Sequence, residues 1–305
     1  MCTAIAFCKD NFFFGRTLDS PYDFDCGVIS LPRYAPLLLS EKEDEKQHFA
    51  ILGMGIVKEG KALFFDAFNE CGLSGAALNF PAKAHYLPTQ QGNIASYEVI
   101  SYVLASAKNL WQVKGILENN KISSLAVSDD MPPTPLHWIF ADKTGAVVLE
   151  QTREGSFVFE SWCEVLTNSP ELWHHERSFL DRISLSPKNP PQTDTEYISE
   201  GKGTDGLAGG FSSKERFLRA AYMRRFAGCE SREDFFGVMG TLSIPRGAVI
   251  SSDGRDHYTR YTSCIDTESM TYSYRTADES RVRAARLSEG LANGKAVEKI
   301  KTDFI

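Results

Sequence analysis

The sequence contains no C-x-x-C pair, no apolar run of 18 residues, no basic run and no linker rich in proline or serine. Its seven cysteines are scattered, which argues against a zinc site and against the disulfide framework of a secreted protein. We expect all but the first to be reduced, buried and structural (Cys8, Cys26, Cys71, Cys163, Cys229 and Cys264). The N-terminus also lacks the features of a secretory signal, so we predict a cytoplasmic protein without a membrane span.

The charge balance argues against another class of partner. The chain has 33 Lys and Arg against 40 Asp and Glu, a formal net charge of −7, which disfavours a nucleic-acid-binding scaffold. If the substrate is an anion, individual arginines must attract it. The 305 residues are 42% hydrophobic and 24% charged, as in soluble globular proteins, and no repeat divides them. We therefore predict one domain over residues 1–305.

The first two apolar runs predict a β-hairpin closed by the turn signal "KDN". A three-residue loop sets Cys8 opposite Phe12 and Cys2 opposite Leu18. In that register Arg16 shares a face with Cys2, because alternate residues of a strand point the same way. A two-residue loop would turn Arg16 to the opposite face, so the loop length decides whether the two side chains meet.

The remaining pattern predicts an α+β fold with helices packed on sheets. Apolar runs indicate further strands and hairpins (48–57, 63–80, 136–152 and 261–276). Apolar residues at helical spacing predict two helical regions (94–117 and 212–226). Ser212 and Glu215 have capping-box spacing at the start of the second. The polar stretch 184–210 is predicted to be a long functional or assembly loop.

Cys2 would become the first residue of the chain if Met1 were removed. A small side chain at position 2 usually permits that removal, which would leave a thiol and a free α-amine on one residue. A free thiol has a pKa of roughly 8.5 and an α-amine one of roughly 7.7 to 8.0, so the pair is poised for proton transfer. Arg16 on the same face would favour the thiolate. The alternative is that position 2 simply holds a small residue.

A papain-like mechanism is a competing explanation for a reactive cysteine, and it needs a histidine partner. None of the six histidines lies in a protease-like signature, and His137 in "LHW" is interpreted as a packed strand residue. The glycine-rich "GKGTDGLAGG" lacks the residue order of a phosphate-binding loop, and no apolar strand precedes it. The residues therefore favour acyl transfer by an N-terminal cysteine over a papain-like hydrolase or a nucleotide-binding protein.

Five motifs follow one another along the chain: "MCTAIAF…FFGRTLD", "ALNFP", "LTNSP", "ERF" and "YTSC". Together they resemble the choloylglycine hydrolase family of N-terminal nucleophile hydrolases, which includes bile salt hydrolases and penicillin V acylases. The likeness extends from residue 1 to about residue 275. It implies a four-layer αββα sandwich with two antiparallel sheets, and hydrolysis of a linear amide without a metal or organic cofactor. Relatives also imply a homotetramer.

The resemblance implies roles for residues of these motifs. Cys2 matches the family's nucleophile, its α-amine the base, and two residues of "GRTLD" match the groups that hold the thiolate and the amine (Arg16 and Asp19). Asn79 of "ALNFP" and Asn168 of "LTNSP" match the family's oxyanion and orienting side chains. Arg216 of "ERF" matches the arginine beside the nucleophile. Taken singly, each residue has an ordinary alternative as a turn, cap or surface residue.

The resemblance also indicates a small-molecule substrate, most simply a bile acid conjugated to glycine or taurine. An asparagine in the position of Asn79 resembles bile salt hydrolases, whereas a tyrosine there resembles several penicillin V acylases. Five residues match pocket positions, although each is equally interpretable as core (Tyr22, Phe24, Val127, Met131 and Leu136). Lys58 departs from the large apolar residue that relatives often have. Penicillin V acylase, another N-acyl amide hydrolase, and a binding protein on the same scaffold stay open as alternatives.

Overall fold

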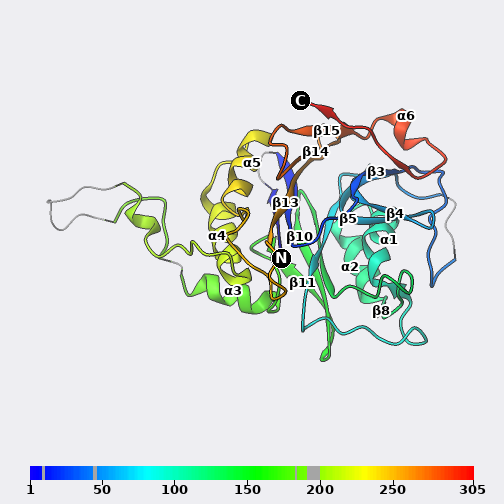
Figure 1. Ribbon diagram of the computed structural model, residues 1–305, viewed down its shortest axis with the longest axis horizontal. Coiled ribbons are helices and arrows are strands. Elements are labelled where there is room, and N and C mark those ends of the chain that lie inside the picture. Colours follow the sequence, from blue (N-terminus) through cyan, green and yellow to red (C-terminus); the bar gives the residue numbers. More distant parts are fainter. Residues whose placement is uncertain (9–10, 44–46, 183, 191–199) are drawn as a thin grey trace.

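The computed structural model describes residues 1–8, 11–43, 47–182, 184–190 and 200–305. Its two large antiparallel sheets lie face to face, and helices cover the outer face of each (Figure 1). The expected four-layer αββα sandwich is thereby confirmed. Part of the "KDN" turn, residues 9–10, and part of the polar stretch, residues 191–199, lie outside the described residues.

The first sheet holds the N-terminal hairpin, which lies next to a short edge strand. In the described chain its order is β12-β1-β2-β13-β14-β15-β17, with antiparallel neighbours throughout. The strands are β1 (Cys2–Cys8), β2 (Phe12–Ser20), β12 (Val165–Leu166), β13 (Tyr258–Asp266), β14 (Thr271–Thr276), β15 (Arg283–Arg286) and β17 (Asp303–Phe304). Every residue of β2 is buried, since helices cover one face of this sheet and the second sheet covers the other. Burial on both faces explains why the hairpin reads as continuous apolar runs.

The second sheet supplies the wall that faces β1 and β2. Its order in the described residues is β11-β10-β9-β6-β5-β4-β3-β16, again antiparallel. The strands are β3 (Gly27–Leu31), β4 (Ile51–Lys58), β5 (Lys61–Asn69), β6 (Ser74–Asn79), β9 (Leu136–Asp142), β10 (Gly145–Thr152), β11 (Gly155–Ser161) and β16 (Glu298–Lys299). A short parallel pair, β7 (Ile94–Ala95) and β8 (Ile122–Ser123), lies apart from both sheets. The strands and turn predicted over 63–80 and the hairpins predicted over 136–152 and 261–276 are confirmed.

Helices form the two outer layers. α4 (Ser213–Phe226) and α5 (Arg232–Gly240) pack on the first sheet and α3 (Leu172–Leu180) packs on α4, while α1 (Val99–Ser106) and α2 (Leu110–Glu118) cover the second sheet. The described residues also include three short helical segments: η1 (Ser96–Glu98), η2 (Lys202–Thr204) and α6 (Glu289–Ala292). Among the described residues, no helix combines the length and the apolar character that a membrane crossing requires.

Two helical predictions need correction. The region 94–117 is interrupted rather than one helix, because Ala107 is extended and the Asn109 side chain accepts a hydrogen bond from the Gln112 backbone to start α2. α3 and α5 were not anticipated, although α5 opens with a complete capping box between Ser231 and Asp234. The start of α4 agrees with the prediction, since Ser212 accepts a hydrogen bond from the Glu215 backbone.

The register of the opening hairpin is the one that a three-residue loop predicts. Cys8 pairs with Phe12, Cys2 with Leu18, and Ala4 with Arg16. Arg16 points toward the second sheet, where its Nη1 donates to the backbone oxygens of Phe65 (3.1 Å) and Ala77 (2.6 Å). Cys2 and Arg16 therefore share the face that meets the second sheet, as predicted.

Gly15 allows β2 and β13 to approach closely beside Arg16. A Cβ atom at Gly15 would lie 2.1 Å from the Ser263 backbone oxygen and 2.8 Å from the Phe235 ring. Because the strands would have to separate, we expect Gly15→Ala to lower the free energy of unfolding by about 1–3 kcal/mol. Gly115→Ala is the control: a Cβ there meets no described atom within 4 Å, and the α2 interior favours alanine. Urea unfolding measures both, and equal stability of the two variants would contradict this account.

Candidate active site

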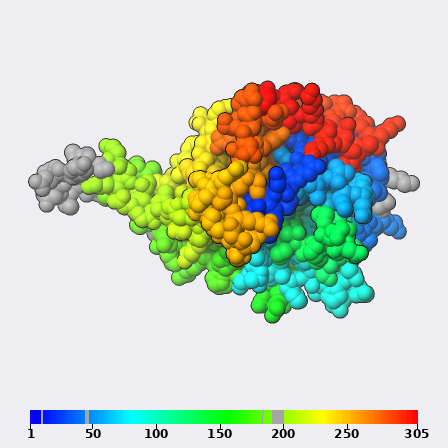
Figure 2. Space-filling model, viewed as in Figure 1, coloured from blue at the N-terminus to red at the C-terminus, as the bar shows by residue number. Residues whose placement is uncertain are grey.

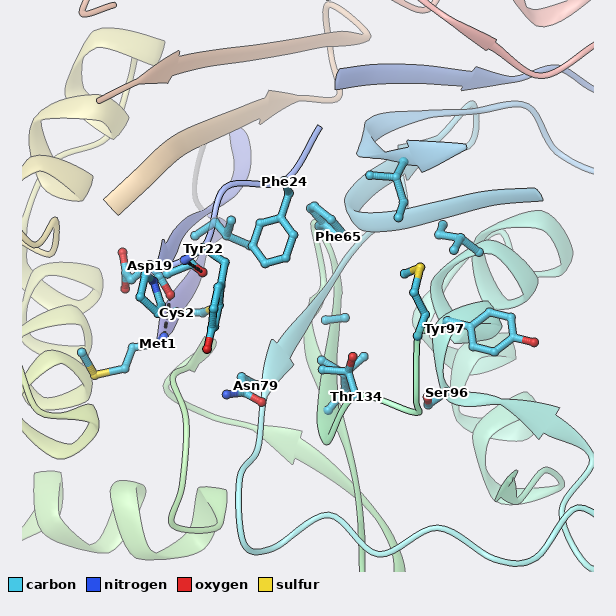
Figure 3. Close-up of a pocket in the computed structure, with 18 of the residues that line it drawn as sticks. Met1, Cys2, Asp19, Tyr22, Phe24, Phe65, Asn79, Ser96, Tyr97 and Thr134 are labelled. Carbon is cyan, nitrogen blue, oxygen red and sulfur yellow. Dashed lines mark hydrogen bonds between the residues drawn. The ribbon is translucent and has the colours of Figure 1, made fainter. Parts of the chain in front are cut away.

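A cavity of about 700 Å³ opens between the two sheets at the N-terminal end of β1 (Figure 3). Cys2 and Asn79 lie at one end of it, and Ser96 and Tyr97 lie at the other (Figure 3). All five residues matched to pocket positions line this cavity: Tyr22, Phe24, Val127, Met131 and Leu136. Sequence reasoning missed much of the remaining apolar wall, which comes from strands of the second sheet (Ile56, Leu63, Phe64, Phe65 and Ala77). Lys58 is not among the described lining residues, so its charge does not enter the cavity wall.

Cys2 is 5% exposed, and its backbone is held on both sides. Its nitrogen donates to Asn168 Oδ1 at 2.7 Å, and its carbonyl oxygen accepts from the Arg216 guanidinium. Met1 is attached in this structure, so the Cys2 nitrogen is a peptide amide that stands where a trimmed chain would carry its α-amine. The position and the hydrogen-bond partner of that amine are thus defined by the fold.

Arg216 connects the residues around Cys2. Besides the Cys2 carbonyl, its Nη1 donates to Thr3 Oγ1, and its Nη2 donates to Asn168 Oδ1 at 2.8 Å. The guanidinium is fully buried and lies 3.9 Å from a carboxylate oxygen of Asp19. Burial lowers the pKa of Arg216, and the nearby Asp19 and Cys2 act in the opposite direction. Arg216 thus brings a positive charge into a site that water barely reaches.

The amide of Asn168 can adopt one orientation. Both Cys2 and Arg216 donate to its Oδ1, so its Nδ2 is the atom that donates to the Asn79 backbone oxygen at 2.6 Å. His175 Nε2 and Ser213 Oγ each lie 2.9 Å from the Asn168 carbonyl oxygen, and the Asn168 backbone N–H donates back to Ser213. These contacts fix the Asn168 backbone, so Asn168 is oriented to accept a hydrogen bond from the Cys2 nitrogen.

Two buried histidines lie next to Asn168 and the residue that precedes it. Burial lowers the pKa of His175 to about 4, so it is neutral where it contacts Asn168. His137 is fully buried in β9, with Nδ1 3.1 Å from Glu150 and Nε2 2.9 Å from the Thr167 carbonyl oxygen. The interpretation of His137 as a packed strand residue is confirmed. Sequence reasoning missed His175 together with the helix α3 that carries it, and the adjacent histidines of "LWHHER" were the available signal.

Arg16 is the second buried cation beside Cys2. Burial alone disfavours its charge, yet the neighbouring Cys2, Tyr261 and Asp66 hold the pKa of Arg16 above its ordinary value. Its Nη2 has no hydrogen-bond partner among the described residues. Arg16 and Cys2 both line the cavity, so this buried guanidinium belongs to the wall around Cys2.

Asp66 is a fully buried carboxylate that sequence reasoning missed. The hydroxyl groups of Tyr261, Ser263 and Tyr272 all donate to it, and Ser263 Oγ also accepts from the Arg16 backbone N–H at 3.1 Å. Burial raises the pKa of Asp66, while Arg16 and the three hydroxyl groups oppose that shift. A lone aspartate within the apolar run "LFFDAF" was the available signal.

Asp19 lies at the end of β2, beside the N-terminus. Its carboxylate accepts from Thr259 at 2.6 Å and from Thr17 at 3.3 Å, so both oxygens are engaged. Its backbone pairs with Met1: the Asp19 N–H donates to the Met1 carbonyl oxygen at 2.8 Å, and the Met1 amine donates to the Asp19 oxygen at 2.6 Å. His257 Nε2, a further neighbour that sequence reasoning missed, lies 2.9 Å from the same Asp19 oxygen.

The remaining cysteines differ in part from expectation. All are free, but Cys71 is exposed, because it lies in the surface turn after β5. Cys8 and Cys26 are half-buried, and burial raises the pKa of each to about 11. The remaining three are buried as expected (Cys163, Cys229 and Cys264).

Comparison with known proteins places the chain in a family. Residues 2–296 match the family described as linear amide C-N hydrolases, choloylglycine hydrolase family. The chain is 32% identical to the bile salt hydrolase/transferase of Lactiplantibacillus plantarum, over 94% of this chain and 93% of that protein. The C2A mutant of the conjugated bile acid hydrolase from Clostridium perfringens superposes with a TM-score of 0.91 and 29% identity, covering 99% of this chain and 97% of that one. Penicillin V acylase from Agrobacterium tumefaciens shares the fold, with a TM-score of 0.77 at 17% identity over 97% and 90% of the two chains. This chain therefore belongs to the choloylglycine hydrolase family of linear amide C–N hydrolases.

Proposed function

We propose that this enzyme hydrolyses the amide bond of bile acids conjugated to glycine or taurine, with Cys2 as the nucleophile. The observation that carries the proposal is the position of Cys2 at one end of a cavity of about 700 Å³ with aromatic and aliphatic walls. A steroid acid needs a wide apolar pocket with few polar anchors. The similarity to the bile salt hydrolase/transferase of Lactiplantibacillus plantarum supports the same substrate class.

The reaction begins once Met1 is removed and the Cys2 nitrogen is an amine. The amine takes the thiol proton, the sulfur attacks the amide carbonyl carbon, and the carbonyl oxygen becomes an oxyanion. When the C–N bond breaks, the amine passes its proton to the leaving nitrogen, and a thioester remains. Water, deprotonated by the same amine, then attacks the thioester, the C–S bond breaks and the bile acid leaves as a carboxylate. The thiol proton thus departs with the amine product, and a proton taken from the hydrolytic water restores the thiol of Cys2.

The surrounding residues serve that proton transfer and the developing charge. Asn168 Oδ1 accepts a hydrogen bond from the amine and so directs its lone pair toward the thiol. Asn79 lines the cavity at the end of β6, on the same side as Cys2, and supplies the oxyanion donor (Figure 3). The buried guanidinium groups of Arg16 and Arg216 bring positive charge beside Cys2, and the Asp19 carboxylate, 3.9 Å from Arg216, balances part of that charge.

The apolar residues around the cavity bind the steroid. Tyr22 and Phe24 are 50% and 39% exposed, so they form the rim that a substrate meets first. Val127, Met131 and Leu136 come from the segment that leads into β9 and form an inner wall. Burying such side chains against a ligand contributes about 25 cal/mol for each Å² of apolar surface removed from water.

Substrate preference is directly measurable. We expect a higher kcat/KM for glycine- or taurine-conjugated bile salts than for penicillin V, because Asn79 and the wide apolar cavity suit the larger acyl group. Purified enzyme is assayed with both substrates side by side by release of the amine. Its Cys2→Ala variant provides the background rate. A higher kcat/KM for penicillin V would favour the penicillin V acylase alternative, and binding without Cys2-dependent turnover would favour a binding protein.

We further propose that residues 1–305 form one domain and that the protein is a cytoplasmic homotetramer. The C-terminal segment supports one domain, because β16 pairs with β3 in the second sheet and β17 pairs with β15 in the first. The described parts of 184–210 project from the side that carries α3 and α4, as an assembly loop would (Figures 1 and 2). Light scattering measures the oligomeric state.

A further inference from the structure

Met1 occupies a defined slot beside Cys2. It extends β1 by one residue, with its carbonyl oxygen bound to the Asp19 N–H and its amine bound to the Asp19 carbonyl oxygen. The same amine lies 2.7 Å from His257 Nε2. Removal of Met1 therefore frees the Asp19 N–H and opens a space beside the His257 imidazole, whose Nε2 also lies 2.9 Å from the Asp19 carbonyl oxygen.

The fold brings His257 to this slot from the far end of the chain. His257 follows a tight turn closed by the bridge between Ile250 and Asp256, and its backbone N–H donates to the Val249 oxygen at 2.8 Å. The turn is attached to the cavity rim, where the Tyr22 hydroxyl donates to Asp253 at 3.2 Å. His257 itself lines the cavity.

The chemistry of the reaction determines which part of the substrate enters this slot. The Cys2 amine must reach the leaving nitrogen within about 3 Å to return its proton. The acyl group extends from the sulfur into the apolar cavity, so the leaving amine lies on the side of the Cys2 nitrogen, where Met1 is attached. Glycine and taurine each carry an anionic group a few bonds from that nitrogen. This distance matches the Met1 amine and carbonyl atoms, which lie a few bonds from the Cys2 nitrogen.

We propose that the slot vacated by Met1 binds the carboxylate or sulfonate of the leaving amine, with the His257 imidazole and the Asp19 N–H as its donors. This inference rests on the proposed function, and it assigns substrate selectivity to a residue outside the five recognised motifs. His257 is thus a specificity-determining residue that acts on the charge of the leaving amine.

The charges around His257 decide its response to pH. It faces the Asp19 backbone and carboxylate, Arg216 and the N-terminal amine, and its own turn carries three more charged groups (Asp253, Arg255 and Asp256). With Met1 attached, burial and the Met1 ammonium lower the pKa of His257. A substrate anion in place of the Met1 ammonium would act in the opposite direction on the pKa of His257 and favour the protonated ring. Selectivity for an anionic leaving amine should therefore increase as the pH falls through the histidine's titration range.

The test compares two substrates that share one bile acid, a glycine conjugate and its uncharged glycinamide analogue. We expect His257→Leu to lower kcat/KM for the glycine conjugate about 10- to 100-fold, because a hydrogen bond to a charged group is lost. The kcat/KM for the glycinamide analogue should stay within about twofold of the wild-type value. His257→Gln, which keeps a neutral donor, should retain part of the selectivity but lose its pH dependence. His174→Gln, on the exposed side of α3, is the matched control and should change neither rate.

The outcomes separate the inference from the proposed function. An equal loss on both substrates, or no loss on either, would overturn the assignment of His257 while leaving bile salt hydrolysis intact. A pH-independent ratio of the two rates in the wild type would do the same. A wild-type enzyme that cleaves neither conjugate would overturn the proposed function and this inference together.

Discussion

Enzyme that retains Met1 is expected to turn over the amide at roughly 1/100 to 1/10,000 of the rate of trimmed enzyme, the range that a general base contributes. The Cys2 nitrogen is then an amide, whose lone pair is delocalised and cannot accept the thiol proton. Met1 also fills the slot beside Cys2, where its amine and carbonyl groups occupy the hydrogen bonds of Asp19. Enzyme that retains Met1 therefore lacks both the general base and the space for the leaving amine.

The measurement combines intact-protein mass with amide turnover on the same sample. Cys2→Ala should be folded and inactive, and a variant that keeps one extra residue ahead of Cys2 should be nearly as inactive although its thiol survives. The second result distinguishes an N-terminal nucleophile from an ordinary cysteine hydrolase. Cys71 is exposed and Cys8 and Cys26 are half-buried, whereas Cys2 is 5% exposed, so thiol alkylation reports on Cys2 in a background that replaces these three cysteines with serine. Full activity in protein that retains Met1 by mass would refute the mechanism.

Asn79→Ala and Asn168→Ala are expected to lower kcat roughly 100-fold or more, with a much smaller change in KM. Asn79 would donate to an oxyanion that exists only after the sulfur has attacked, so its loss falls on the transition state. Asn168 accepts a 2.7 Å hydrogen bond from the Cys2 nitrogen, and in the proposed mechanism it orients the amine, so its loss would affect both proton transfers. Neither side chain contributes much to ground-state binding of the steroid, which the apolar wall provides.

Asn119→Ala is the matched control, because Asn119 is an exposed asparagine at the end of α2 whose side chain donates to the Gly115 backbone oxygen. Asn168→Ala leaves a buried Arg216 donor without its partner, so thermal unfolding must show that the variant is folded. Asn168→Asp keeps the acceptor for Arg216 but sets an oxygen against the Asn79 carbonyl oxygen. Wild-type kcat in folded Asn168→Ala would remove Asn168 from the mechanism.

Local rules account for the parts of the fold that sequence reasoning predicted. The hairpin register follows from one loop length and the two-residue repeat of a strand, so Cys2 and Arg16 were assigned to one face correctly. α4 begins where Ser212 satisfies a free backbone N–H. The break before α2 depends on a cap at Asn109 within an otherwise helical pattern, and periodicity alone does not detect such a break.

Sequence alone determined the chemistry of the nucleophile, because a thiol next to a removable methionine and the motif residues Arg16, Asp19 and Asn168 are properties of short segments. Tertiary structure alone decided how these groups connect. The Cys2 nitrogen and its acceptor on Asn168 are 166 residues apart, and the Met1 amine and His257 are 256 residues apart. No local pattern encodes such contacts, since they arise when two sheets close over a shared core and the turn between Ile250 and Asp256 reaches the N-terminus. Asp66 likewise becomes buried, with its carboxylate bound by the Ser263 hydroxyl, only when the sheets of the sandwich pack together.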